Sequence, residues 1–241
     1  MKYVAFAALA LAACSGGGDG NVQSAEPVAA VAAPAGGNWT ETVSKTAEGG
    51  YVMGNPNAPI KLVEYGSRTC PTCGAFGREA TRPLEDNYIK SGKVSYEFRD
   101  YLVHGAPDLA AALLGQCGGT GPFFPILEQM YQNQAAYLDK LQQTPPAVQA
   151  RLQGMAPAQA ITALAEQMAL IEFVKQRGVP EAKARACLAD AAQIDGLTKQ
   201  TQDATASGAV TGTPTFLLNG KKLENTVSWA QVEQALKAAG A

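Results

Sequence analysis

The chain has 241 residues, of which 46% are hydrophobic, and its 19 Lys and Arg against 21 Asp and Glu give a formal net charge of −2 at pH 7. A mildly acidic chain without a basic patch is a poor match for a protein that binds nucleic acid. The length is sufficient for one domain with a sizeable core, or for a domain that carries an insertion.

The first residues predict an export signal. Lys2 precedes an apolar run from Tyr3 to Ala13, which is shorter than the roughly 20 residues that a membrane-spanning helix needs. Such a start is typical of a secretory signal peptide, here residues 1–13. The run ends in Leu11-Ala12-Ala13-Cys14, which resembles the lipobox of bacterial lipoproteins and implies lipid on Cys14. An ordinary signal peptide with an incidental cysteine is the alternative.

Residues 14–37 are rich in Gly, Ala, Pro and Ser and contain few large apolar side chains. Such a segment cannot bury enough surface to fold, so we expect a lipidated, flexible tether. An exported, lipidated chain would lie in the periplasm on the inner or the outer membrane, in an environment where disulfides persist.

The first folded part is expected at residues 38–105. Ile60–Tyr65 is apolar and β-branched and predicts a buried strand. A helix should follow Cys73, with a kink or a division at Pro83. Val94–Tyr101 alternates in polarity and predicts a second strand, so the unit is βαβ.

Residues 106–205 have helical periodicity and predict an inserted helical domain. Residues 206–241 return to strand signals. Thr215–Leu218 is followed by Asn219-Gly220, a strong hairpin signal, and then by a short strand near Lys222. Ser228 with Gln231 predicts a capping box that opens a last helix. The predicted class is α/β, with the order βαβ, helical insertion, ββα.

Four cysteines remain once Cys14 carries lipid, and an even number suits an exported protein. Only Cys70 and Cys73 are forced close by the chain, which leaves Cys117 with Cys187. A structural disulfide is the favoured interpretation of the second pair, and a second redox pair or two buried thiols are the alternatives.

The stretch Cys70-Pro71-Thr72-Cys73 lies between a predicted strand and helix. Pro71 suits the first helical position, so Cys70 faces the positive end of the helix, which favours a thiolate. We therefore predict that Cys70 is the nucleophile and Cys73 the resolving thiol. A zinc site would need more ligands, and the chain has no second CxxC and one histidine, so we expect no metal. A purely structural disulfide at this spacing is the other alternative.

Two stretches, MGNPNAPIKLVEYGSRTCPTCGAF and GAVTGTPTFLLNGK, resemble the DsbA family of thioredoxin-fold thiol oxidoreductases. The resemblance extends from about Trp39 to the C-terminus and includes the place of the insertion. It implies a thioredoxin-like fold, a cis bond before Pro214, and a Thr213 backbone that pairs with an extended substrate. A proline at a strand edge is the alternative for Pro214.

The resemblance also implies that Glu64 is a buried carboxylate near Cys73, with a raised pKa that suits proton transfer. An exposed position at the strand edge is the alternative. In a typical member of the family a histidine stands where this chain has Thr72. We therefore expect a less depressed Cys70 pKa and a less oxidising disulfide than in a CPHC protein. His104 is expected to be structural.

The resemblance implies a monomeric enzyme of the cell envelope that introduces disulfides into exported proteins through a Cys70 mixed disulfide. It further implies reoxidation by a DsbB-like, quinone-linked membrane partner, and no cofactor. A disulfide isomerase or reductase of the same fold, and a peptide-binding chaperone of the envelope, are the alternatives.

Overall fold

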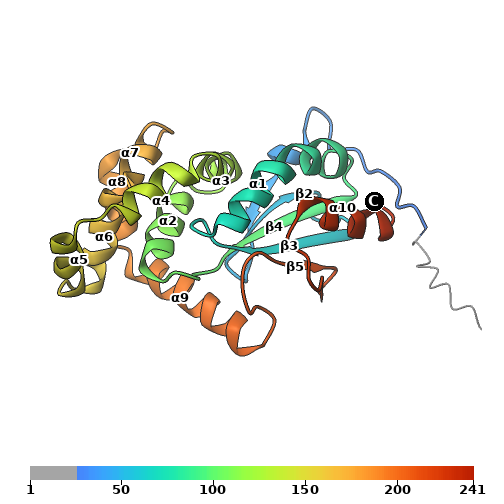
Figure 1. Ribbon diagram of the computed structural model, residues 1–241. Coiled ribbons are helices and arrows are strands. Elements are labelled where there is room, and N and C mark those ends of the chain that lie inside the picture. Colours follow the sequence, from blue (N-terminus) through green and yellow to red (C-terminus); the bar gives the residue numbers. More distant parts are fainter. Residues whose placement is uncertain (1–25) are drawn as a thin grey trace, which may run out of the picture.

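The computed structural model describes residues 26–241 (Figure 1). The predicted signal peptide, Cys14 and the first part of the predicted tether lie outside these residues. Within the described part, no helix combines the length and the apolar character that crossing a bilayer requires.

The centre of the fold is a six-stranded sheet with the order β1-β2-β4-β3-β5-β6. β3 and β4 pair in parallel, and every other neighbouring pair is antiparallel. The strands are β1 (Val43–Lys45), β2 (Tyr51–Gly54), β3 (Ile60–Gly66), β4 (Val94–Asp100), β5 (Thr215–Leu218) and β6 (Lys221–Lys222). The predicted βαβ unit and C-terminal hairpin are confirmed, whereas β1 and β2 have no counterpart among the predicted elements.

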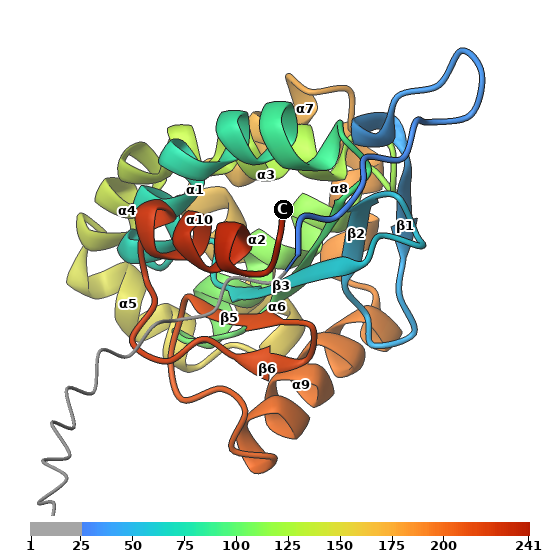
Figure 2. The same cartoon turned by 90° about the vertical axis from the view of Figure 1, so that its right-hand side faces the viewer.

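Helices cover both faces of this sheet. α1 (Pro71–Leu84) and α10 (Trp229–Ala238) lie on one face, and the end of α9 (Ala191–Ala206) lies on the other (Figures 1 and 2). Alternate residues of β3 serve the two faces, because Leu62 joins the main core with α1 and α10, whereas Val63 packs toward Ala204. The thioredoxin-like class with an inserted helical domain is therefore confirmed.

The insertion runs from α2 to α9 and has an apolar core of its own. Its helices are α2 (Ala106–Gln116), α3 (Phe123–Gln132), α4 (Gln134–Gln142), α5 (Pro146–Gln153), α6 (Pro157–Gln167), α7 (Leu170–Lys175), α8 (Glu181–Leu188) and α9. One of them also belongs to the main core, because α3 packs its aromatic face against α1 through Phe124 and Tyr131. The insertion is thus built into the main fold beside the start of α1.

Several local predictions are met by the backbone. Asn219 and Gly220 both have positive φ, as a tight hairpin turn of this kind requires. The capping box at the start of α10 is present, with the backbone N–H of Ser228 donating to Gln231 Oε1 at 3.1 Å. α1 includes Pro83 and ends one residue later, where a π-helical turn over Glu85–Ile89 replaces it.

The described part of the predicted tether, residues 26–37, is attached to the domain. The N–H groups of Val28 and Val31 donate to the carbonyl oxygens of Gly240 and Ser91 at 2.8 and 2.9 Å. Trp39 Nε1 donates to Val31 O at 2.7 Å. For these residues the expectation of a free tether is wrong, because a few backbone hydrogen bonds hold the segment although it buries little apolar surface.

The predicted pairing of Cys117 with Cys187 is present as a disulfide that joins the end of α2 to α8. The two cysteines are 70 residues apart in sequence. Closing a loop of that size reduces the entropy of the unfolded chain, which on the chain-entropy account stabilises the fold by about 4 kcal/mol.

The variant Cys117→Ala/Cys187→Ala should therefore lower the free energy of unfolding by about 4 kcal/mol, as measured by denaturant titration. Its Cys70 thiol should titrate as in the unchanged protein, because the disulfide lies in the insertion core and not in the β3–α1 turn. A loss below about 1 kcal/mol would show that the bridge does not constrain the unfolded chain as this account requires.

Candidate active site

Cys70 and Cys73 lie at the start of α1, and residues 67–69 separate Cys70 from the end of β3 at Gly66. Cys70 is the N-cap residue with extended backbone, and Pro71 occupies the first turn, where its missing N–H costs no hydrogen bond. Both cysteines are thiols here, so the structure describes the reduced pair. Cys70 is 8% exposed and Cys73 is fully buried. An attacking group can therefore reach Cys70 and not Cys73.

The electrostatics of the pair are strongly asymmetric. A hydrogen bond from the Cys73 thiol is the largest influence on Cys70, burial opposes it, and a Thr213 donor and the backbone N–H groups of Cys73 and Thr72 assist it. Together they lower the pKa of Cys70 from 9.0 to about 5. Burial first, and then that same hydrogen bond and the charge of Glu64, raise the pKa of Cys73 far above its usual range. At neutral pH the pair holds one thiolate, on Cys70.

Glu64 is fully buried in β3 and faces the thiol pair from the sheet. Tyr96 OH donates to Glu64 Oε2 at 2.6 Å, while Oε1 is buried with no partner among the described residues. Burial raises the pKa of Glu64 from 4.5 to about 8, the Tyr96 hydrogen bond opposes the rise, and the Cys70 charge adds to it. A carboxyl group that is neutral near pH 7 can give a proton to a nearby thiolate or take one back.

The peptide bond between Thr213 and Pro214 is cis. It brings the Thr213 carbonyl oxygen to 3.5 Å from Cys70 Sγ, although the two residues are 143 positions apart. The Thr213 hydroxyl is buried and has no hydrogen-bond partner among the described residues, so its proton is available to a Cys70 thiolate. Beside this turn, residues 211–215 and 222–227 line an open groove of about 590 Å³.

Thr72 is exposed, and its contribution to the pKa of Cys70 comes through its backbone N–H. His104 lies beside the active-site turn, with Nδ1 at 2.7 Å from Thr69 Oγ1 and at 3.7 Å from Asp108 Oδ2. The sequence prediction of a purely structural His104 is not tested by these contacts. The His104 ring contacts Thr69, the residue directly before Cys70.

The turn before Cys70 contains polar contacts that sequence reasoning missed. Arg68 is buried and forms an ion pair with Asp100, with its Nε at 2.7 Å from Oδ1. Gln134 of α4 donates to the carbonyl oxygens of Arg68 and Cys70 at 3.1 and 2.9 Å. A Cβ on Gly74 would collide with the Gln134 amide, so this glycine lets the insertion approach α1. The one sequence signal was the polar run Ser67-Arg68-Thr69 inside an otherwise apolar stretch.

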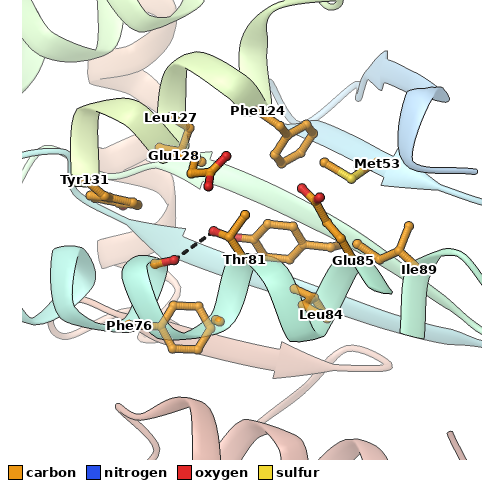
Figure 3. Close-up of a pocket in the computed structure, with 13 residues that line it drawn as sticks. Met53, Phe76, Thr81, Leu84, Glu85, Ile89, Phe124, Leu127, Glu128 and Tyr131 are labelled. Atoms are coloured by element: carbon orange, nitrogen blue, oxygen red, sulfur yellow. Dashed lines mark hydrogen bonds between the residues drawn. The ribbon is translucent and has the colours of Figure 1, made fainter. Parts of the chain in front are cut away.

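A second hollow, of about 410 Å³ including its mouth, lies between α1 and α3 and contains neither cysteine (Figure 3). Apolar side chains such as Phe76 and Leu127 line it, and Glu85 and Glu128 add two carboxylates. Burial and then the charge of Glu128 raise the pKa of Glu85. Among residues 26–241 there is no cluster of three or more His, Cys, Asp or Glu side chains that could hold a metal ion.

Comparison with known proteins agrees with this geometry. A family model described as Thioredoxin matches residues 46–238. A Rickettsia bellii protein named "Putative protein-disulfide oxidoreductase" is 26% identical over 181 residues, which is 75% of this chain and 61% of the relative. Disulfide bond formation protein D of Bacillus subtilis is 29% identical over 80 residues, 33% of this chain and 36% of the relative. The match to the Rickettsia bellii relative thus covers less than two thirds of that protein's length.

Among solved structures, protein-disulfide isomerase from Novosphingobium aromaticivorans superposes with a TM-score of 0.75 and 29% identity, over 79% of this chain and 97% of that one. Wolbachia pipientis alpha-DsbA1 gives a TM-score of 0.61 and 19% identity over 77% and 87% of the two chains, which bears on the fold alone.

The asymmetry of the thiols predicts a titration. The thiolate absorbance of the reduced protein should rise with a midpoint near pH 5, from Cys70. In Cys73→Ala the midpoint should move up by roughly one to two units, because the strongest donor to the thiolate is lost. The oxidised protein is the control and should show no transition. An unchanged midpoint in Cys73→Ala would contradict this account.

Glu64 predicts a pH-dependent stability. The folded protein keeps a proton that the unfolded chain releases above pH 4.5, so this stabilisation is complete below pH 4.5 and is lost as the pH rises through about 8. In a Cys70→Ala/Cys73→Ala background, where no thiol titrates at this site, Glu64→Gln should unfold without that dependence. Between pH 4.5 and about 8, the unfolding free energy of the protein with Glu64 should fall relative to that of the Glu64→Gln variant by up to about 1.4 kcal/mol per pH unit. Parallel pH profiles would contradict the buried, neutral Glu64.

Proposed function

The chain belongs to the thioredoxin family whose model spans residues 46–238, and on that premise we propose that it is a DsbA-like thiol:disulfide oxidoreductase that introduces disulfides into other proteins. The observation that carries the proposal is the asymmetric pair, with a stabilised thiolate at Cys70 and a buried thiol at Cys73. A structural disulfide or a peptide-binding chaperone has no use for such an asymmetry.

In the oxidising direction the reaction starts from a Cys70–Cys73 disulfide. A substrate thiolate attacks Cys70 Sγ, the S–S bond breaks, and its electron pair leaves with the Cys73 sulfur. A second substrate thiolate then attacks the substrate sulfur of the mixed disulfide and releases Cys70 as a thiolate. Two electrons have passed from the substrate to the pair, and the substrate holds the new disulfide. The low pKa of Cys70 makes it a good leaving group in this last step.

Glu64 would supply the proton for the first step. The departing Cys73 thiolate forms in a buried site where burial disfavours its charge. Glu64 is neutral below about pH 8, so its carboxyl proton is available to Cys73 at neutral pH, and Tyr96 holds the resulting carboxylate by a hydrogen bond. In the reverse direction the same group accepts the proton.

The cis bend at Thr213-Pro214 would hold the substrate. Its backbone lies beside Cys70 and lines an open groove, so an extended chain can pair with it as an added strand while its cysteine reaches Cys70 Sγ. This recognition uses the main chain, which suits an enzyme that acts on many unfolded sequences.

The chemistry also suggests where the protein works. The Cys117–Cys187 bridge suits an oxidising compartment, which agrees with export and a lipid anchor at Cys14 in the periplasm. We include in the proposal a DsbB-like, quinone-linked membrane partner that returns the Cys70–Cys73 thiols to the disulfide.

The reduction potential of the Cys70–Cys73 pair can be approximated from the pKa of Cys70. A nucleophile with a pKa of about 5, against about 7 in thioredoxin, favours the thiolate at pH 7 by up to about fifty-fold, or about 50 mV. Added to thioredoxin's roughly −270 mV, this gives a potential near −220 mV, below that of a strong oxidant with a histidine between its cysteines. The name of the Novosphingobium aromaticivorans neighbour makes disulfide isomerisation the second candidate.

One experiment separates the two candidates. Net oxidation transfers two electrons and needs both cysteines, whereas isomerisation needs only the nucleophile at position 70. The oxidised protein should convert a reduced two-cysteine peptide to its disulfide, one per molecule, and Cys73→Ser should lose this activity. The Cys117→Ala/Cys187→Ala variant is the matched control and should keep it. If Cys73→Ser still rearranges a scrambled protein while the unchanged chain oxidises the peptide poorly, isomerisation is the function.

A further inference from the structure

Asp108 is a buried carboxylate that gathers the turn before Cys70. It is 2% exposed and lies in the first turn of α2, where the helix dipole favours a negative charge. Its Oδ1 accepts hydrogen bonds from Ser67 Oγ at 2.7 Å, from Thr69 Oγ1 at 2.6 Å and from the Thr69 N–H at 3.2 Å. Its Oδ2 accepts from the His104 N–H at 2.7 Å. Every one of these donors belongs to the β3–α1 turn or to the segment before α2.

The hydroxyl of Thr69 fixes the proton on the neighbouring histidine. A hydroxyl has one proton, and that of Thr69 Oγ1 is donated to Asp108 Oδ1. The contact of 2.7 Å between Thr69 Oγ1 and His104 Nδ1 is then a hydrogen bond in which Nδ1–H is the donor. His104 and Asp108 thus both hold the Thr69 hydroxyl, and His104 Nδ1 lies 3.7 Å from Asp108 Oδ2.

The same turn touches the thiol pair through its backbone. The Ser67 N–H donates to Cys73 Sγ at 3.4 Å. Cys73 is also the largest influence that lowers the pKa of Cys70. Ser67 therefore links the two sites, because its N–H contacts Cys73 while its hydroxyl is held by Asp108.

We propose that Asp108, with Ser67 and Thr69, forms a positioning group that keeps the Cys73 thiol directed at Cys70 and thereby sets the reactivity of the pair. The inference deepens the proposed function and rests on it in one respect, that Cys70 and Cys73 are the reacting pair. Asp108 touches neither sulfur in this arrangement and acts through the turn.

The sign of the effect separates positioning from simple charge. The titratable and charged groups near the active-site turn are Glu64 in β3, Arg68 with its partner Asp100, and Asp108 beside His104. The negative charge of a carboxylate such as Asp108 would by itself disfavour a thiolate at Cys70. Positioning acts in the opposite direction. Variants that loosen the turn and leave the Asp108 charge in place therefore test positioning alone.

Ser67→Ala removes the hydroxyl bond from Ser67 to Asp108 and leaves the carboxylate and both cysteines unchanged. The titration midpoint of Cys70, followed by thiolate absorbance in the reduced protein, should rise by about one unit, a tenfold loss of thiolate relative to thiol. Thr69→Val should raise it in the same direction, whereas Thr69→Ser keeps the hydroxyl and should match the unchanged protein. Thr81→Val is the control, since it removes a hydroxyl that donates to Gly77 O within α1 and has no bond to Asp108 or to the turn.

Midpoints for Ser67→Ala and Thr69→Val equal to that of the unchanged protein would overturn the proposal and leave Asp108 as a structural acceptor. If Ser67→Ala fails to fold, the comparison of Thr69→Val with Thr69→Ser decides alone. The titration uses no substrate, so a shift in these variants stands even if the protein fails to oxidise peptides. Loss of peptide oxidation in Ser67→Ala with an unchanged Cys70 midpoint would overturn positioning and leave the proposed function standing.

Discussion

The buried guanidinium of Arg68 is the constraint around which the active-site turn is organised. A charge this far from water needs a partner, and Asp100 at the end of β4 supplies two carboxylate contacts at 2.7 and 3.2 Å. Gln116 of α2 donates to the same carboxylate at 2.9 Å, and the ring of Phe123 lies 5.1 Å from the guanidinium carbon. Removing one partner of such a pair costs about 3–5 kcal/mol, because the other charge is left buried alone. The turn, the sheet and the insertion are therefore fixed to one another at this point.

That attachment joins the insertion to the turn that carries the two cysteines. Helices of the insertion supply Asp108 to the side chains of the turn and Gln134 to its carbonyl oxygens. A turn of this length between a strand and a helix has more polar groups than the helix start can satisfy. With those groups bonded on the outside, the N–H of Ser67 is left to face Cys73. The helical domain thus acts as the outer half of the active-site scaffold.

The sequence predicted the elements that local rules control. The CPTC stretch, the Asn219-Gly220 turn and the capping box at Ser228 each depend on neighbouring residues, and each lies where its pattern indicated. Arg68, Asp100 and Asp108 were missed because charged residues are usually exposed, and their burial depends on partners 32 to 41 residues away. The attachment of Val28 was missed because its backbone partner, Gly240, is also distant in the sequence. Composition describes what a segment can bury, and it does not show which distant backbone group will accept its N–H.

Thr72 shows how the structure changes the weight of a sequence feature. Its side chain is exposed, and its contribution to the Cys70 thiolate is a backbone N–H that any residue except proline would provide. The larger contributions come from the Cys73 thiol and from Thr213, which are held in place by the buried turn and by the cis bend. A positive charge at position 72 would stabilise the Cys70 thiolate further, because a unit charge about 4 Å away near a protein surface is worth more than the roughly 1 kcal/mol of bulk water. The residue between the cysteines therefore acts on a Cys70 pKa that the buried donors have already brought down to about 5, and the two influences on the thiolate add.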